Sequence, residues 1–249
     1  MKGNSNLLMD YKKEYFKTKN KTLSRVHFTN DDMWWSDGDP LGYSYQKETN
    51  TNFLDLALPY LKNNRVAIQA GGNCGWVTRE VANHFKDVYV FEPDPSSFVC
   101  ICLNLPEGNV HKFQSCLGDR HGLVEMSKDH GKGGSGADYV NPVTEKFRLF
   151  QENSSAKVPT MLIDDLKLDF CDFIQLDLEG YEYFALLGAE ETIKKHEPLI
   201  WMERCWHERF NVFDETIDNF FKNLGYALVE RHGKHDFIYK HLDSEEEYQ

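Results

Sequence analysis

Short apolar runs and stretches of helical periodicity alternate along the chain from residue 65 onward. Five apolar runs have the length of strands and end at polar or turn-forming residues: 66–69, 88–91, 110–115, 173–176 and 198–202. Helical spacing predicts helices over 76–85, 96–105 with Ser96 as the N-cap, 181–195 and 213–224. Because strands that alternate with helices form right-handed βαβ units, this order predicts an α/β fold with a mostly parallel sheet covered on both faces.

Two further strands, 227–229 and 236–239, close the chain without a helix between them. A short connection joins antiparallel neighbours, so these strands predict an antiparallel C-terminal hairpin. The segment 128–157 contains four glycines between 131 and 136 and is expected to form a long loop, which is either a functional lid or disordered.

The first 62 residues follow a different pattern. Apolar side chains near helical spacing predict an amphipathic helix over 2–20, an aromatic segment with turn formers spans 33–42, and 53–61 predicts a short helix. We therefore divide the chain into a helical and aromatic N-terminal extension (1–62), an α/β domain (63–241) and an acidic tail (242–249). The extension is expected to pack on the core of the domain, with covering a cofactor or contacting the substrate as the alternatives.

Composition and charge narrow the classes of function. A formal net charge of −12 argues against nucleic-acid binding, because phosphate contacts depend on clustered Lys and Arg. Apolar runs fall short of the roughly 18 residues that span a bilayer, and the N-terminus is polar, so neither membrane association nor a signal peptide is expected. The six cysteines lack the paired spacing of a zinc site, which predicts reduced thiols in a cytoplasmic protein.

A glycine-rich run follows the first strand of the domain, where open α/β sheets bind ligands at the carboxyl ends of their strands. Gly71 and Gly72 allow a tight turn and a close approach of a ligand to the backbone, and Gly75 allows the next helix to pack closely. Such a run serves either a nucleotide-like ligand or a plain tight turn. The candidate ligand contacts here are Gln69, Gly71, Gly72, Asn73, Cys74 and Gly75.

The next two strand ends add candidates for the same ligand. The second strand ends in Glu92, whose acceptor oxygens suit both ribose hydroxyls of an adenosine. After the third strand, Cys116 and Leu117 offer apolar contacts to an adenine ring, and Asp119 offers a polar partner for its amino group. Both NAD and S-adenosylmethionine (SAM) satisfy this arrangement, and Gly118 with Asp119 is also compatible with a simple turn.

Carboxylates gather at the ends of the fourth and fifth strands. Asp177 and Glu179 follow one apolar strand, Glu203 ends the next, and His207 comes shortly after. Paired acids on an apolar strand are costly to bury without a partner, which favours a role in a site over a role in packing. A carboxylate can remove a proton from a hydroxyl, so Asp177 or Glu179 is the expected catalytic base. Glu203 and His207 are alternatives or substrate-orienting groups.

Together these motifs resemble the FkbM family of methyltransferases over roughly residues 42–239. The resemblance is carried by 71–75, 90–95 and 176–182, with a weaker match at 158–166. It implies a Rossmann-like class I methyltransferase sheet, in which the closing hairpin is antiparallel, and SAM as cofactor. It also implies methyl transfer to a hydroxyl of a sugar or small metabolite, so the partner is a small-molecule or glycan acceptor. Four aromatic residues are candidates to stack on a sugar ring or to pack in the core: Trp34, Trp35, Trp201 and Trp206.

Two positions depart from the family pattern. Family members carry an acid where this chain has Gln69 and a lysine where it has Gln175. Either the acidic role toward the cofactor passes to Asp177, or the chain is a noncatalytic binding protein that kept the fold. A nicotinamide-dependent oxidoreductase is the other alternative. No metal cluster is predicted, although acidic strand ends bind Mg²⁺ in catechol-type methyltransferases, and the sequence does not indicate an oligomeric state.

Overall fold

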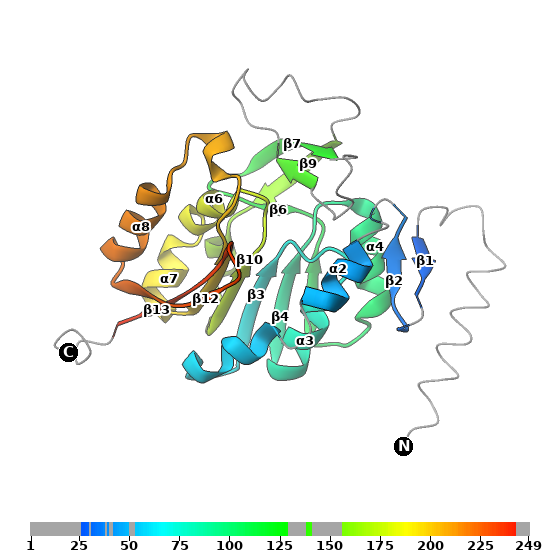
Figure 1. Cartoon of the computed structure of the whole chain (residues 1–249), viewed down its shortest axis with the longest axis horizontal. Helices are drawn as coiled ribbons and strands as arrows, with labels where there is room; N and C mark the ends of the chain where they lie inside the picture. Colours follow the sequence, from blue (N-terminus) through cyan, green and yellow to red (C-terminus); the bar gives the residue numbers. More distant parts are fainter. Residues whose placement is uncertain are drawn as a thin grey trace.

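A seven-stranded sheet forms the centre of the computed structural model, which describes residues 26–29, 31–37, 39, 42–49, 53–128, 138–140 and 156–242 (Figure 1). The strand order is β12-β13-β11-β10-β3-β4-β5. The bounds are β3 (Val66–Ala70), β4 (Asp87–Phe91), β5 (Val110–Phe113), β10 (Phe173–Leu176), β11 (Leu199–Glu203), β12 (Tyr226–His232) and β13 (Asp236–His241). The helix expected over 2–20 and the tail from 243 onward lie outside the described residues.

Within the described sheet, β13 is the strand that runs against the others. β5, β4, β3, β10 and β11 are parallel neighbours. β13 pairs antiparallel with β11, and β12 pairs antiparallel with β13. The predicted parallel sheet and its closing hairpin are thus confirmed. Because parallel strands end on the same side, the polar strand ends singled out in the sequence share one edge of the sheet.

Helices cover both faces of this sheet (Figure 1). One face carries α3 (Trp76–His84), α4 (Pro95–Asn104) and the short 3-10 helices η1 (Phe53–Leu56) and η2 (Leu58–Tyr60). The other carries α6 (Glu182–Leu187), α7 (Glu190–His196) and α8 (Asp214–Asn223). Successive strand residues point to opposite faces. Ala67 therefore belongs to an apolar cluster with Val81 of α3, whereas Ile68 belongs to one with Ala185 of α6.

The start of α4 differs from the prediction. Its N-cap is Asp94 rather than Ser96, because the Asp94 Oδ1 accepts hydrogen bonds from the backbone N–H groups of Ser96 (3.0 Å) and Ser97 (2.9 Å). Pro95 occupies the first helical position, where a missing N–H has no consequence. The carboxylate before the proline therefore satisfies the next two donors.

Two predicted helices are each divided in the structure. The helix predicted over 181–195 is interrupted at Gly188 and forms α6 and α7. A Cβ at Gly188 would lie 2.0 Å from the carbonyl oxygen of Gly118, so the backbones touch at this break. The helix predicted over 53–61 consists of η1 and η2, which have 3-10 geometry.

A second, four-stranded sheet lies beyond the carboxyl ends of the parallel strands, at the top of Figure 1. Its order is β6-β9-β7-β8, with bounds β6 (Cys116–Leu117), β7 (Gly122–Lys128), β8 (Asp138–Val140) and β9 (Ala156–Met161). β7 pairs antiparallel with both β8 and β9. The prediction of a loop over 128–157 is therefore wrong where those residues are described, since 138–140 and the start of β9 are strands.

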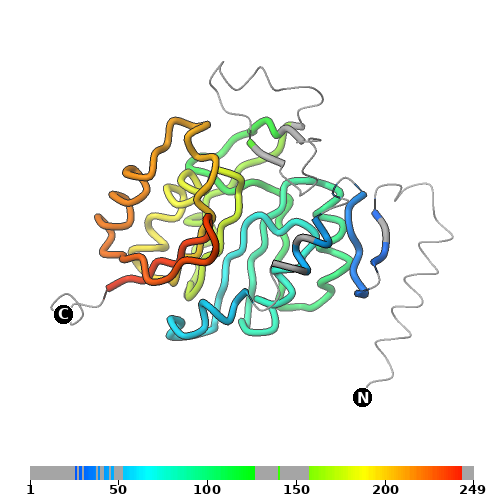
Figure 2. The backbone as a smooth tube through the Cα atoms, viewed as in Figure 1, coloured from blue at the N-terminus to red at the C-terminus, as the bar shows by residue number. Residues whose placement is uncertain are grey.

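The described part of the N-terminal extension packs on the domain, as predicted. It comprises β1 (Val26–Phe28), β2 (Trp34–Ser36) and α2 (Gly42–Thr49), and β2 lies beside α4 (Figure 2). Asn104, at the end of α4, accepts a hydrogen bond from the Trp34 N–H (2.7 Å). Its amide nitrogen donates to the carbonyl oxygens of Trp34 (2.8 Å) and Cys74 (2.6 Å). Trp35 is fully buried in the same cluster as Cys74.

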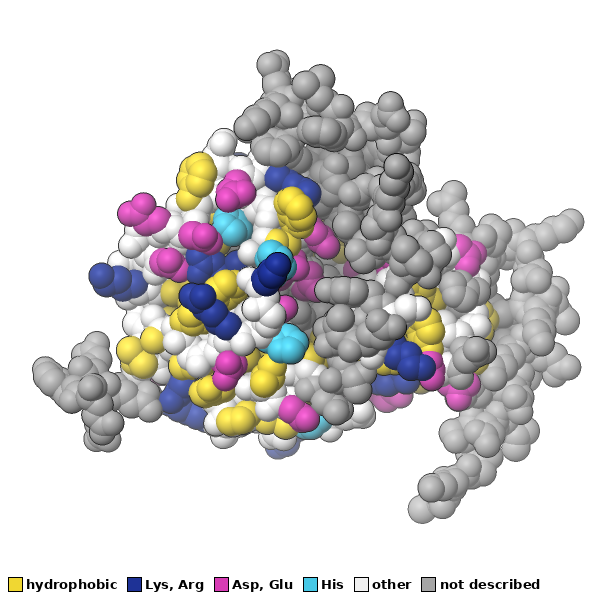
Figure 3. Space-filling view, viewed as in Figure 1, with side chains coloured by type: hydrophobic (Ala, Val, Ile, Leu, Met, Phe, Trp, Pro, Cys, Tyr) yellow, Lys and Arg dark blue, Asp and Glu magenta, His cyan; other side chains and the backbone are white. Residues whose placement is uncertain are grey.

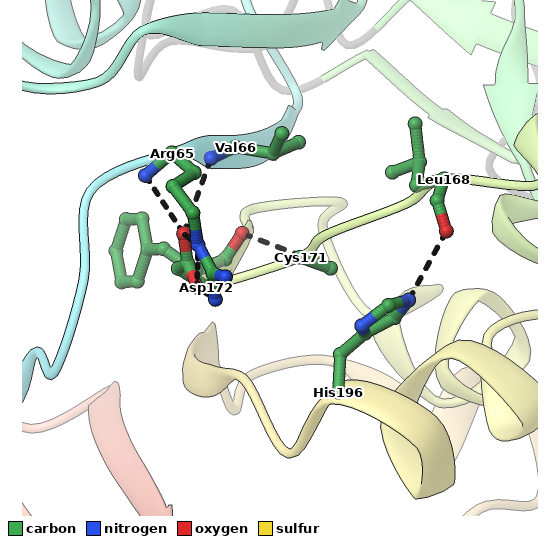
Figure 4. Close-up of polar contacts among 7 residues, drawn as sticks. Arg65, Val66, Leu168, Cys171, Asp172 and His196 are labelled. Carbon is green, nitrogen blue, oxygen red and sulfur yellow. Dashed lines mark hydrogen bonds and ion pairs between the residues drawn. The ribbon is translucent and has the colours of Figure 1, made fainter.

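One carboxylate joins the starts of β3 and β10 at the amino-terminal edge of the sheet (Figure 4). The Asp172 Oδ2 accepts hydrogen bonds from the backbone N–H groups of Arg65 (2.7 Å) and Val66 (3.3 Å). The Arg65 guanidinium donates to both oxygens and lies 4.0 Å from the ring centroid of Phe170. Burial alone would raise the pKa of Asp172, but the hydrogen bonds from Arg65 and Val66 hold it below its ordinary value.

The surface carries charges of both signs. On the face shown in Figure 3, Lys and Arg side chains lie among acidic and hydrophobic ones. Exposed large apolar side chains, which are common singly on protein surfaces, include Leu123, Phe170, Trp206 and Phe213. Among the described helices, none has the length and apolar character needed to cross a membrane.

Candidate functional site

The glycine loop between β3 and α3 is held against the ends of two neighbouring strands. The N–H groups of Gly71 and Gly72 both donate to the Phe91 carbonyl at the end of β4 (3.1 Å each). Gly71 has a φ of +79°, and a Cβ there would lie 1.8 Å from the carbonyl oxygen of Asp177, just after β10. Only glycine combines this conformation with this close approach, so the loop ties the ends of β3, β4 and β10 together.

Glu92, predicted to bind a ribose, fixes the loop from the end of β4. Its Oε2 accepts a hydrogen bond from the Asn73 N–H (2.7 Å), and its Oε1 accepts one from the Asp94 N–H (2.7 Å). Asn73 has a φ of +45°, in the left-handed region that asparagine tolerates. A carboxylate has about four acceptor sites, so these two bonds orient Glu92 without exhausting its acceptor capacity.

The other residues predicted to contact the cofactor lie at different depths. Cys74 is fully buried beneath the loop, and burial raises the pKa of its thiol. Cys116 and Leu117 are also buried and contribute to apolar clusters. The Asp119 side chain is partly exposed, with its Oδ1 3.2 Å from the Arg120 Nε. Cys74, Cys116 and Leu117 thus pack in the interior, whereas Asp119 is partly accessible to solvent.

A small cavity, partly open to solvent, lies over the glycine loop. Its walls come from the N-terminal extension, the loop, α3 and the end of β10. Covering the cofactor was among the roles considered for the extension, although packing on the core was the preferred one. The lining residues are Trp35, Gln46, Gln69, Gly71, Gly72, Asn73, Trp76, Val77, Gln175 and Asp177.

Gln69 and Gln175, the two departures from the family pattern, are register partners on β3 and β10 and line this cavity together. The Gln69 amide is used within the protein: Nε2 donates to the Gly71 carbonyl (3.1 Å), and Oε1 accepts from the Thr78 hydroxyl (2.8 Å). The Gln175 amide oxygen is buried and has no hydrogen-bond partner among the described residues. In family members, the acid at position 69 and the lysine at position 175 would therefore face each other as a charged pair. This chain lacks both of those charges.

Asp177, Glu179 and Glu203 form a carboxylate cluster at the ends of the adjacent strands β10 and β11. The charges of Asp177 and Glu203 influence each other's ionisation. Burial first, and then the charge of Glu179, raises the pKa of Asp177 to about 7. Burial and the charges of Asp177 and Glu179 raise the pKa of Glu203 to about 10. Neighbouring buried carboxyl groups do not all ionise together at neutral pH, so the cluster retains a proton.

A further buried carboxyl, Glu182, was not among the predicted site residues. It is 1% exposed, and its Oε1 accepts hydrogen bonds from the N–H groups of Leu178 (2.6 Å) and Gly180 (3.3 Å). Its Oε2 has no partner within the described chain, and burial raises the pKa of Glu182 to about 8. These bonds hold the connection after β10 in a tight loop, in which Glu179 has a φ of +52°. The sequence offered one signal for this role: Glu182 stands at the start of a helix, four residues after Leu178, whose N–H it binds.

The tight loop packs against the segment that follows β11. A Cβ at Gly180 would lie 2.8 Å from the carbonyl carbon of Trp206. Trp206 is 55% exposed, with the Arg209 guanidinium 4.5 Å from its ring centroid, whereas Trp34, Trp35 and Trp201 are buried. Of the four tryptophans considered for stacking, Trp206 therefore presents an accessible ring beside the carboxylate cluster.

Cys205 adds a buried thiol next to the carboxylate cluster. Donor atoms of Glu179, Glu203 and Cys205 all lie within 4.8 Å of one another, a spacing that a metal ion can bridge, although the sequence predicts no metal site. His207 lies in a different network: its Nε2 is 3.3 Å from the Asp214 Oδ1 on α8. The structure thus brings the three predicted carboxylates together and pairs His207 with α8.

Comparisons with known proteins agree with this geometry. A model of the methyltransferase FkbM domain matches residues 70–228. The structure is similar to the methyltransferase FkbM from Methylobacillus flagellatus KT, at 17% identity and a TM-score of 0.50, with 72% of this chain and 44% of that chain covered. It is also similar to the N-methyltransferase NodS from Bradyrhizobium japonicum WM9, at 12% identity and a TM-score of 0.47, with 82% and 99% covered. NodS has also been crystallised with S-adenosyl-L-homocysteine.

No curated protein matches the sequence. The chain spans less than half of the length of the Methylobacillus flagellatus structure that it matches.

Proposed function

The chain belongs to the FkbM methyltransferase family, with SAM as its cofactor, and we propose that it methylates a hydroxyl group of a sugar or small metabolite. The observation that carries this proposal is the position of Asp177, a carboxyl of raised pKa that belongs to the carboxylate cluster and lines the cavity over the glycine loop. Membership of this family rules out the nicotinamide-dependent oxidoreductase that the glycine loop and Glu92 also allowed.

The residues around the cavity fit the cofactor. Gly71 and Gly72 offer backbone without side chains, and Glu92 is oriented at the strand end that suits a ribose. Among the described residues, nothing bonds to the buried amide oxygen of Gln175. When bound, SAM supplies an electrophilic methyl group on a sulfonium. An unpartnered buried amide lowers the stability of the folded chain. Its presence in this cavity supports a working site over a noncatalytic protein that kept the fold.

Asp177 is the proposed base. A neutral hydroxyl is a weak nucleophile, and a base that accepts its proton as the new bond forms contributes about 10²–10⁴-fold to the rate. A pKa of about 7 gives Asp177 a substantial fraction of carboxylate at neutral pH together with useful basicity. The pKa of Glu203 is raised to about 10, so Glu203 remains protonated and adds no negative charge beside Asp177.

The remaining predicted catalytic residues take other roles in this proposal. Glu179 raises the pKa of Asp177 through its negative charge. His207 takes no part in proton transfer, because its ring pairs with Asp214 on α8. Trp206, with its exposed ring, is the surface on which a sugar acceptor would stack.

The test is transfer of a labelled methyl group from SAM to separate panels of sugars, small alcohols and primary amines, using the full chain. We expect label in a hydroxyl acceptor, with kcat rising with pH through a midpoint near 7, because Asp177 acts in its ionised form. Transfer to amines alone would overturn the choice of acceptor. Binding of S-adenosylhomocysteine without transfer to any panel would favour the noncatalytic alternative.

A further inference from the structure

The amide oxygen of Gln175 is buried in the cavity wall without a hydrogen-bond partner among the described residues, as is that of Asn73, whose amide nitrogen bonds to Asp39. The Gln175 side chain lines the cavity beside Gly71 and Asp177, and the residue is 6% exposed. In the part of the chain that the structure describes, neither end of the Gln175 amide takes part in a hydrogen bond. Buried amides in native proteins almost always have partners, so an unpaired one in a cavity points to a bound group that completes it.

Gln69 provides an internal comparison on the neighbouring strand. The two glutamines are register partners and line the same cavity. Both ends of the Gln69 amide are bonded within the protein, to the Gly71 carbonyl and the Thr78 hydroxyl, so Gln69 braces the loop against α3. Gln175 braces nothing among the described residues, which leaves its donor and acceptor for a ligand.

We propose that Gln175 binds the amino-acid end of SAM and determines the specificity for that end of the cofactor. Its amide oxygen accepts a hydrogen bond from the α-ammonium group, and its amide nitrogen donates one to the α-carboxylate. This inference rests on the proposed function. A primary amide is a neutral group that offers both an acceptor and donors, which matches a zwitterion, whereas an acid or a lysine pairs with one of the two charges only.

The test compares two ligands that differ in this end alone. S-adenosylhomocysteine has the amino-acid end, and 5′-methylthioadenosine has the same nucleoside and sulfur without it. Gln175→Met preserves the length of the side chain and removes the amide. By calorimetric titration of the full chain, we expect this variant to bind S-adenosylhomocysteine about 10- to 100-fold more weakly than the wild type, with the affinity for 5′-methylthioadenosine changed by less than about twofold.

Gln69→Met is the matched control. It removes the brace between the Gly71 carbonyl and the Thr78 hydroxyl, so we expect it to weaken both ligands by a similar factor. If Gln175→Met does not fold, Gln175→Glu gives a second measurement. It keeps the acceptor but repels the α-carboxylate, and should likewise weaken S-adenosylhomocysteine selectively.

Two results would overturn the assignment of Gln175. One is an equal loss of both ligands in the Gln175 variants, and the other is an unchanged affinity for S-adenosylhomocysteine. Failure of the wild type to bind S-adenosylhomocysteine has a different meaning, since it would overturn the proposed function itself and this inference with it.

Discussion

Asp172 and Asp177 flank the same short strand, β10, yet their carboxyl groups have opposite surroundings. Before the strand, Asp172 accepts hydrogen bonds from a guanidinium and two backbone N–H groups, and its pKa is below the ordinary value. After the strand, Asp177 meets Glu203 and Glu179, and its pKa is raised to about 7. One strand of four residues therefore separates a stabilised charge from a destabilised one.

The amino-terminal edge of the sheet therefore holds a carboxyl group that stabilises the fold, whereas the carboxyl-terminal edge holds one that suits catalysis. A lowered pKa means that the ionised group stabilises the fold, so the contribution of Asp172 is present above its ordinary pKa and is lost as the pH falls through the folded value. The raised pKa of Asp177 has the opposite sign: its contribution is complete at acid pH and is lost as the pH rises through about 7. Carboxyl groups held in this second state are typical of catalytic sites.

The largest effect is expected at the carboxyl end. Asp177→Asn removes the proposed base, so kcat should fall by about 10²–10⁴-fold while the melting temperature stays the same or rises, because a buried charge is lost. Glu203→Gln is the matched variant: glutamine imitates the protonated acid, and kcat should fall by less than about tenfold. Steady-state kinetics and thermal melts measure both. Equal losses of kcat in the two variants would contradict the assignment of Asp177, rather than Glu203, as the base.

The reverse pattern is expected at the amino end. Asp172→Asn keeps an acceptor but loses the charge that pairs with Arg65, so the free energy of unfolding should fall by about 1–3 kcal/mol with kcat unchanged. Urea denaturation at neutral pH measures the loss. The difference from the wild type should shrink as the pH falls below the ordinary pKa of 3.8 toward the lower folded pKa of Asp172, because protonation there removes the charge. A variant of full stability and reduced turnover would contradict the division of roles between the two ends.

A third expected effect is a change in the pH dependence of stability. Burial raises the pKa of Glu182 from 4.5 to about 8, so ionisation of this group increasingly destabilises the fold as the pH rises between those values. Glu182→Gln keeps the acceptor for the Leu178 and Gly180 N–H groups and removes the titration. The stability of the variant relative to the wild type should therefore increase from pH 5 to pH 8. Parallel stability curves, measured by denaturation across this range, would contradict it.

The sheet could be predicted because its information is local. Each parallel strand is an apolar run bounded by polar residues, and the absence of a helix between 229 and 236 specified the antiparallel hairpin. The second sheet was missed because its strands are short and its pairings, such as Val124 with Val158, join distant segments. The N-cap of α4 was assigned to Ser96 because both it and Asp94 are good caps, and only the backbone geometry distinguishes them.

The candidate site divides in the same way. The glycine loop and the carboxylate cluster were predictable, because Gly71 is required by its backbone conformation and the acids follow strand ends that share an edge. The pairing of His207 with Asp214 depends on where α8 packs, which no local pattern encodes. The same holds for the wall that Trp35 adds to the cavity, since it requires the extension to fold back over the loop.

The hydrogen bonds of Asn104 couple the order of two segments of the chain. Its single amide group bonds both to β2 in the extension and to the Cys74 carbonyl in the glycine loop. Order in one of these segments therefore favours order in the other, and thermodynamic reciprocity makes the coupling equal in both directions. A ligand that immobilises the loop also protects β2 from local unfolding, and loss of the extension lowers the apparent affinity of a site that lies in the domain.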